Sequence, residues 1–301
     1  EGDIIHADET EVQVLKEPNR EAKQKSRMWL FCAPACDHPL YVYEYHPTRS
    51  GDVAARFLTG WTGTLTTDGY KPYFTLDGIT NTACLVHARR RFAEIVKVAG
   101  GDIKAEEAGS VALEARRMID HMFAVDSKFD ALDANERRTR RNSELRPLME
   151  KFFTWAQARL LEAVPTLALH GALAYAIKYW PYVMNVLDDG RLELSNNIAE
   201  RAIKPFVIGR KNFLFSDTPR GAEASAGIYS VVTTAKMNGL NPRKYIEWLL
   251  TVMPNTANLD DPTVLDTMMP WSNSIDNDLR LSPAKAAEVA EMRDDPIIAI
   301  D

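Results

Sequence analysis

The sequence is poor in cysteine and has no long apolar run. Its 301 residues include three cysteines, and this small, odd number argues against a disulfide scaffold and predicts a reducing compartment, the cytoplasm. No segment approaches the roughly 18–20 apolar residues of a membrane span. The chain opens Glu1-Gly2-Asp3, without an initiator methionine or the apolar core of a signal peptide, so we expect a longer protein to continue upstream.

The negative charge of the chain is concentrated at one end. The formal net charge is −6, but residues 255–301 carry ten acidic and three basic side chains, whereas residues 1–254 carry 32 acidic and 33 basic ones. Segment 195–220 holds five basic and two acidic residues. The total charge argues against bulk binding of polyanions, but a locally basic segment attracts anionic partners.

The first hundred residues predict strands followed by helices. Alternating or clustered apolar residues predict strands at 3–16, 27–33 and 40–45, and their short polar links predict an antiparallel meander. A short helix is expected at 50–60, a strand at 64–67, a short helix or turn at 70–78, a strand at 82–86 and a helix at 87–99. This order predicts a mixed α/β sheet flanked by helices.

Residues 103–187 are helical by periodicity, with Pro147, Pro165 and Pro181 dividing them into three or four helices. The run 137–141 contains four arginines, which is typical of a nucleic-acid patch, but its flanking glutamates favour a solvated helix face. Beyond this region, helices are expected at 222–238, at 242–252 and at 282–292. The expected organisation is a core at 1–101, an all-helical insertion at 102–190, completion of the core at 191–254 and an acidic tail at 255–301.

A short polar helix is expected to begin at Ser195-Asn196-Asn197 and to end at Pro205. At helical spacing Asn197, Glu200, Arg201 and Lys204 share one face, which places a carboxylate among cations. Asn197 and Glu200 also form the pattern of a capping box, which needs no active site.

Two aspartates are placed to join Glu200. Asp8 lies in the first expected strand, and Asp68 follows the fourth, where ligands of α/β sheets gather. If the first strand lies beside the fourth and the helix of Glu200 packs against them, three carboxylates converge, as in a ribonuclease-H-like arrangement. The alternatives are a polar strand residue for Asp8 and a turn aspartate before glycine for Asp68.

Several ordered motifs resemble transposases of the insertion-sequence-66 family. They are HADET at 6–10, DGY at 68–70, CLVHARRRF at 84–92, DDGRLELSNNIAERAIKP at 188–205 and GRKNFLF at 209–215. IYS at 228–230, TAKMNGLNP at 234–242 and MPW at 269–271 resemble the carboxy-terminal element of that family. The resemblance covers residues 4 to about 271, and residues 272–301 have no counterpart.

The resemblance implies a ribonuclease-H-like DDE core with a helical insertion, whose catalytic and metal-binding triad falls on Asp8, Asp68 and Glu200. Such carboxylates suit two Mg²⁺ or Mn²⁺ ions, which prefer oxygen ligands. The implied activity is two-metal-ion hydrolysis and strand transfer of DNA, at transposon ends and target, by a homo-oligomer. The alternatives are a metal-dependent nuclease on the same core and a catalytically silent DNA-binding module.

The resemblance also bears on residues outside the proposed triad. Contacts to DNA phosphates are expected from the basic side chains Arg89, Arg91, Arg201, Lys204, Arg210 and Lys211, for which a surface ion-pair network is the alternative. The family usually has an acidic residue where Ser195 stands and Trp-Ala where Leu85-Val86 stand, and the amino-terminal DNA-binding segments that family members usually carry are expected to lie outside these 301 residues. Cys32, Cys36, Cys84 and His87 have irregular spacing for zinc, which favours buried thiols and a structural histidine.

Overall fold

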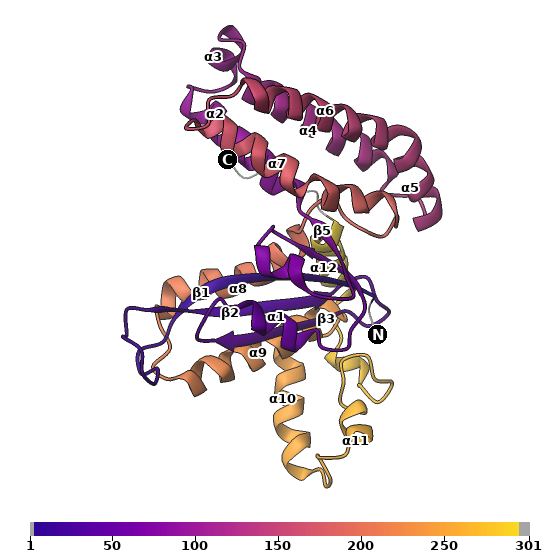
Figure 1. Cartoon of the computed structure of the whole chain (residues 1–301). Helices are drawn as coiled ribbons and strands as arrows, with labels where there is room; N and C mark the ends of the chain where they lie inside the picture. The colour runs from indigo at the N-terminus through magenta and orange to yellow at the C-terminus, as the bar shows by residue number, and fades with distance from the viewer. Residues whose placement is uncertain (1–2, 295–301) are drawn as a thin grey trace. The chain divides into compact units, whose positions relative to one another are not determined.

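The computed structural model describes residues 3–294 and divides the chain into two compact units (Figure 1). Unit 1 comprises Glu1–Gly60 and Asn197–Asp301, and unit 2 comprises Trp61–Asn196. The chain contains antiparallel and parallel strands together with many helices, so the expected mixed α/β class is confirmed. The four-segment division expected from the sequence stays a prediction. Among residues 3–294, no helix combines the length and the apolar character needed to cross a bilayer.

Unit 1 is built on a three-stranded antiparallel meander, as predicted. Its strands are β1 (Ile4–Gln13), β2 (Lys25–Ala33) and β3 (Leu40–His46). His6 lies opposite Cys32, and Met28 lies opposite Tyr45. Strand β2 is therefore paired along both sides within this unit.

Both faces of the meander are covered, which explains why β2 is apolar at consecutive positions. On one face, helix α1 (Gly51–Phe57) places the ring of Phe57 against Phe31, with centroids 3.9 Å apart. On the other face, α8 (Asn197–Phe213) contributes Ile203 and Phe206, and α9 (Pro219–Met237) contributes Ala226, to a core with Met28 and Leu30. Successive side chains of β2 point to opposite faces, so each one meets a helix layer.

Helix α8 is about twice as long as predicted, because Pro205 lies inside it and does not end it. A proline within a helix loses one backbone hydrogen bond and disfavours the helical conformation. Here Ala199, Ala202, Ile203 and Phe206 form an apolar stripe at helical spacing that continues past Pro205 into the core. Burial of this stripe outweighs the local cost of the proline.

The outer edge of β3 is closed by polar side chains of α9. Tyr43 N–H donates to Ser230 Oγ at 2.8 Å, and Tyr41 N–H donates to Thr234 Oγ1 at 3.1 Å. The Thr234 hydroxyl donates back to the Tyr41 carbonyl at 3.0 Å, and Asn238 Nδ2 donates to the carbonyl of Pro39 at 2.7 Å.

The spacing of this ladder follows from backbone geometry. Four helical residues rise about 6 Å and two strand residues about 6.8 Å, so side chains four apart on α9 match backbone groups two apart on β3. An exposed row of unpaired strand groups invites pairing with another chain, and the ladder satisfies that row within unit 1.

The remaining elements of unit 1 extend from α9. They are α10 (Pro242–Val252), η5 (Met253–Asn255), α11 (Pro262–Asp266), η6 (Asn277–Leu279) and α12 (Pro283–Asp294). Asn241 caps α10, as its position before Pro242 predicted, and Gly239 has a positive φ of 77° at the end of α9. Helix α11 was not predicted, because it spans only five residues. Residues 295–301 of the predicted acidic tail lie outside the described residues.

Unit 2 combines one parallel strand pair with helices. Strand β4 (Gly63–Thr67) pairs with β5 (Ile79–Ala83). The other elements are η1 (Lys71–Thr75), α2 (Leu85–Val98), α3 (Asp102–Glu107), α4 (Val111–Asp126), η2 (Ser127–Phe129), α5 (Ala134–Arg140), η3 (Arg141–Leu145), α6 (Arg146–Glu162), α7 (Ala168–Met184) and η4 (Asn185–Leu187). Every element from α3 to η4 is helical, as predicted for this region. Aromatic rings fill its core, where Phe152 stacks on Trp180 at 4.5 Å.

The arginine run in unit 2 corrects the prediction of a solvated helix face. Arg138 and Arg140 are exposed as expected, but Arg141 is fully buried and Arg137 nearly so. Arg141 binds both carboxylate oxygens of Asp126, at 2.6 and 2.8 Å, and donates to the carbonyl of Leu192 at 2.7 Å. A buried guanidinium requires such compensation because its desolvation is costly.

Removal of a ladder hydroxyl should destabilise unit 1. The isosteric change Thr234→Val leaves the Tyr41 amide and carbonyl without their helix partner, and we expect a loss of about 1–3 kcal/mol in the free energy of unfolding. Ser225→Ala serves as the control, because Ser225 on the same helix bonds only the Gly221 carbonyl one turn earlier and should cost under about 0.5 kcal/mol. Equal urea midpoints for both variants would contradict the ladder's role.

Candidate active site

Asp8 lies on the face of the sheet that α8 covers. Strand side chains alternate between faces, so Asp8 shares its face with Val12, which is part of the core with α8. Asp8 is half-buried, and its Oδ1 accepts the N–H of Glu9 at 2.9 Å. The carboxylate therefore stands at the boundary between the apolar layer and solvent.

Glu200 lies in the first turn of α8 and is half-buried. Helix α8 runs along β1 in the same direction, because Arg210 donates to Thr10 Oγ1 at 3.2 Å and Ser216, just beyond α8, forms a parallel bridge with Val14. Glu200 precedes Arg210 by ten residues, or about 15 Å of helix, which corresponds to about four to five strand residues. Counted back from Thr10, this distance places Glu200 beside Ile5 and His6, two to three strand residues from Asp8.

Asp68 belongs to unit 2, where it follows the last residue of β4, at the strand end predicted from the sequence. Its Oδ1 accepts the N–H of Tyr70 at 2.8 Å, which closes a tight turn around Gly69 at φ +96°. This turn is further held by two tyrosine hydroxyls of α7. Tyr175 donates to the Asp68 carbonyl at 2.8 Å, and Tyr179 donates to the Gly69 carbonyl at 2.6 Å.

The tyrosine contacts leave little freedom at this turn. A Cβ at Gly69 would lie 2.7 Å from the Tyr175 hydroxyl oxygen, so both the positive φ and the close approach require glycine. The guanidinium of Arg91 lies 4.0 Å from the centre of the Tyr175 ring. Burial raises the pKa of Tyr175 above its ordinary value, so the hydroxyl remains a donor at neutral pH. Sequence reasoning missed both tyrosines, because aromatic residues four apart on a helix are also typical of a core.

The six basic residues expected at DNA divide into two groups. Arg89 forms an ion pair with Asp120, Arg91 packs on Tyr175, and Arg210 is tied to β1. Arg201 is half-buried on the first turn of α8. By contrast, Lys204 and Lys211 are exposed and form no ion pair with any residue between 3 and 294.

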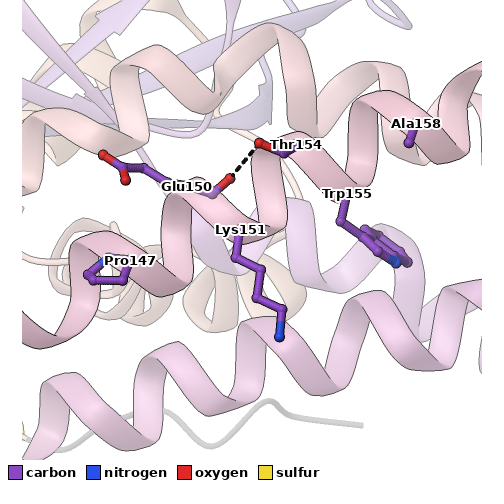
Figure 2. A pocket seen from close by; sticks show the side chains of 6 residues that line it. All are labelled: Pro147, Glu150, Lys151, Thr154, Trp155 and Ala158. Carbon is purple, nitrogen blue, oxygen red and sulfur yellow. Dashed lines mark hydrogen bonds between the residues drawn. The ribbon is translucent and has the colours of Figure 1, made fainter.

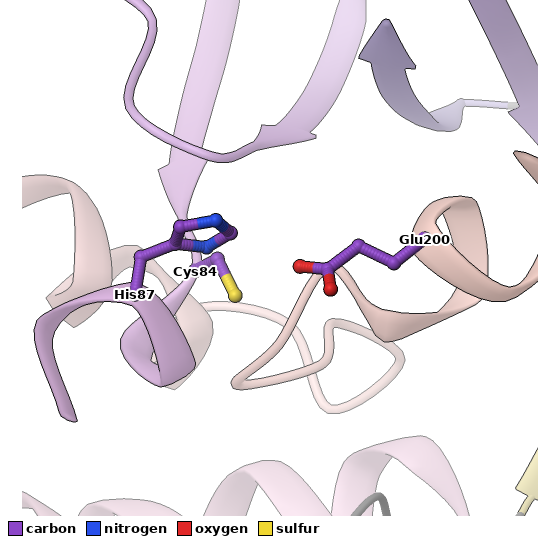
Figure 3. Close-up of side chains that lie close together, drawn as sticks. All are labelled: Cys84, His87 and Glu200. Carbon is purple, nitrogen blue, oxygen red and sulfur yellow. The ribbon is translucent and has the colours of Figure 1, made fainter. Parts of the chain in front are cut away.

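The cysteines are divided between the two units. Cys32 and Cys36 belong to unit 1, and all three thiols are free. Cys84 and His87 lie side by side at the start of α2 (Figure 3), with ligand atoms within 4.8 Å of each other. Cys84 Sγ accepts the N–H of Asn196 at 3.1 Å. A structural zinc ion takes four such ligands, and this pair supplies two.

A surface hollow of about 570 Å³ lies along α6 (Figure 2). It is lined by Pro147, Glu150, Lys151, Thr154, Trp155 and Ala158. All of these residues come from one helix, and none is an expected site residue. The hollow also lacks the convergent polar groups of an active site.

Comparison with known proteins agrees with the motifs. The family model described as "Transposase IS66 family" matches residues 1–224, and that of the "IS66 C-terminal element" matches residues 230–271. Uncharacterized protein y4jD of Sinorhizobium fredii (strain NBRC 101917 / NGR234) is 30% identical over 291 residues, which cover 89% of this chain and 53% of that protein. Uncharacterized protein y4hP of the same strain is 28% identical over 287 residues, with 89% and 50% covered.

The chain thus spans about half the length of the curated relatives it matches. No solved structure matches it.

The Cys32 thiol should resist alkylation. Burial raises its pKa, and the nearby Asp8 carboxylate raises it further. We expect iodoacetamide to modify half-exposed Cys36 in the native chain, whereas Cys32 reacts only after unfolding. Because only the unfolded Cys32 thiol ionises at mildly alkaline pH, its contribution to stability is complete below about pH 8.5 and declines above it. Peptide mapping that found fast modification of Cys32 in the native chain would contradict this.

The two tyrosine hydroxyls should hold the Asp68 turn. In the double variant Tyr175→Phe, Tyr179→Phe, the two hydrogen bonds to the turn are lost together with the bond from Lys178 to the Tyr179 hydroxyl. We expect about 1–3 kcal/mol lower stability with faster amide exchange at Gly69 and Tyr70. Tyr182→Phe is the control, because its ring packs on Phe74 while its hydroxyl bonds no residue between 3 and 294. An unchanged rate of amide exchange in the double variant would show that the turn is stable without the tyrosine hydroxyls.

Proposed function

Because the chain belongs to the IS66 transposase family, we propose that it contains the catalytic core that cleaves and joins DNA strands during transposition. Asp8, Asp68 and Glu200 are the proposed catalytic residues and the proposed ligands of divalent metal ions. The proposal requires these three carboxylates, two from unit 1 and one from unit 2, to converge.

The chemistry of the donor set supports Mg²⁺ or Mn²⁺. Three carboxylates offer only oxygen ligands, which these hard cations prefer. Asp8, Asp68 and Glu200 would together hold the ions. Two such ions, when bound, stabilise the attacking and leaving oxygens of an in-line displacement at phosphorus.

The proposed reaction has two displacements. In the first, a water oxygen bonds to phosphorus while the bond from phosphorus to the 3′ oxygen breaks, which frees a 3′-hydroxyl at the transposon end. In the second, that hydroxyl bonds to a phosphorus of target DNA and releases a target 3′-hydroxyl. Neither step needs a serine or cysteine nucleophile. The fixed backbone of the Asp68 turn supports the proposal, since catalysis gains from ligands held in place before the reaction.

The single observation that carries most of the proposal is the shared direction of α8 and β1 in unit 1. It supports the proposed pairing of Asp8 and Glu200, residues 192 positions apart in the sequence. Lys204 lies one turn after Glu200 and Lys211 lies near the end of α8. Exposed lysines on this helix suit phosphate contacts, which make DNA binding sensitive to salt but carry no sequence information.

DNA ends, a DNA target and a homo-oligomer that brings the ends together are proposed partners of the whole protein. A metal-dependent nuclease on the same core remains the second candidate, since it would use the same three carboxylates. The two differ in their second step. Incubation with a DNA end already cut to a free 3′-hydroxyl gives a joined product for a transposase and none for a nuclease.

Replacement of any one carboxylate should abolish metal-dependent DNA cleavage. For Asp8→Asn, Asp68→Asn and Glu200→Gln we expect losses of more than about a hundredfold, because even groups that only support a metal ligand are worth about 10–100-fold. Glu11→Gln is the matched control on β1, since its side chain is mostly exposed and pairs with Arg27; it should retain the parent rate. Parent-level cleavage by all three variants would remove the proposed site.

A further inference from the structure

We propose that the turn Phe213-Leu214-Phe215 is an apolar wedge that contacts DNA bases beside the cations of α8. The inference rests on the proposed function, because it takes DNA as the substrate. It adds a contact to the bases themselves, whereas the lysines reach only the phosphates.

The backbone of this turn is strained. Phe215 N–H donates to the carbonyl of Phe213 at 2.8 Å, and the intervening Leu214 has φ +64°. A bond between residues two apart around a positive φ defines the rare, strained form of the γ-turn. Leucine tolerates a positive φ poorly, whereas glycine adopts it readily. Strain of this kind persists where surrounding structure enforces it, and it is concentrated at functional sites.

Both flanks of the turn are anchored within unit 1. Before it, Leu214 N–H donates to the carbonyl of Arg210 at 2.8 Å, and the ring of Phe213 packs edge-on against Phe206. After it, Ser216 N–H donates to the carbonyl of Gln13 at 2.9 Å. The turn is therefore a rigid projection between the end of α8 and the end of β1.

The rigid turn presents apolar side chains to solvent. Phe213, Leu214 and Phe215 are 40%, 62% and 44% exposed. Single exposed apolar residues are common, but a continuous group of them marks an interaction site. Phe213 contributes to the core through Phe206, but Leu214 is mostly exposed, so folding alone does not explain its strained backbone.

The surrounding charges favour DNA as the occupant. Between residues 204 and 220, the exposed cations Lys204, Lys211 and Arg220 form no ion pair with any residue that the structure describes. The one carboxylate in that interval, Asp217, is already paired with Lys16 at 2.8 Å. Three adjacent side chains are also far fewer than the roughly 20–30 residues per partner of a stable protein interface.

Phenylalanine and leucine among cations suit nucleic acid. Aromatic rings stack on bases of any sequence, and apolar wedges inserted at a base step unstack it and bend the duplex. A wedge should therefore prefer DNA in which a base step is already open, because the cost of unstacking has been met beforehand.

The test compares an intact duplex with the same duplex carrying a one-nucleotide gap, by fluorescence anisotropy without divalent metal. The parent chain should bind the gapped duplex about tenfold more tightly, since stacking on a base is worth roughly this factor or more. Phe215→Ala and Leu214→Gly should abolish the preference. Because Leu214→Gly also relieves the positive φ, its thermal stability should equal or exceed that of the parent, so lost binding cannot reflect unfolding.

Two control variants distinguish the effect of the wedge on DNA binding from the effects of neighbouring apolar and basic side chains. Ile208→Ala removes another exposed apolar residue of α8, 52% exposed, and should keep the preference. Lys211→Ala should weaken binding to both duplexes and lower its salt dependence while keeping their ratio.

Equal binding of both duplexes by the parent, no binding at all, or an unchanged preference in Phe215→Ala and Leu214→Gly would overturn the proposal. Sedimentation that showed a parent dimer dissociated by Leu214→Gly would instead assign the turn to contact between two copies. Since no cleavage is measured, these outcomes are independent of the metal site. Failure of the carboxylate variants to lose cleavage would refute the proposed chemistry without changing the binding result.

Discussion

The packing of α8 along β1 is the contact on which the rest of unit 1 depends. An apolar stripe holds the helix against the sheet, and Arg210 with the bridge from Ser216 to Val14 fixes its direction. Direction matters because an antiparallel helix with the same stripe would carry Glu200 to the opposite end of β1, away from Asp8. The polar contacts thus select between two arrangements that burial alone would leave nearly equivalent.

One face and one edge of the meander are closed by segments distant in sequence. Helices α8 and α9 follow β3 by about 150 residues, yet they supply one face of the core and the ladder along its edge. Because the strands cannot complete their core until these helices arrive, the meander and the C-terminal helices of unit 1 form one cooperative structure. The loop between them can therefore hold a large helical insertion without a penalty that grows steeply with its length.

Elements that depend on alternating apolar residues and on helix caps were predicted correctly from the sequence. Features that depend on tertiary contacts were not. The meander, the turn at Asp68 and the caps at Gly239 and Asn241 follow from local patterns. The end of α8 does not follow from a local pattern. A proline within a helix usually ends it, but burial of Phe206 against β2 and β3 carries this helix past Pro205. The burial of Arg141 was equally hidden, since its partner Asp126 lies 15 residues away and its carbonyl acceptors lie beyond residue 185. The convergence of the three carboxylates remains a prediction.

The helices between Asp68 and Glu200 in the sequence have a structural role at the candidate site that their composition does not reveal. Two hydroxyls from α7 reach the turn after β4 from more than a hundred residues away. A short turn formed by an aspartate and a glycine has many accessible conformations. Each hydrogen bond to its backbone carbonyls removes some of them. The insertion therefore does more than separate Asp68 from Glu200 in sequence. It fixes the backbone of the turn that carries Asp68, so the geometry of this turn depends on these helices staying folded against it.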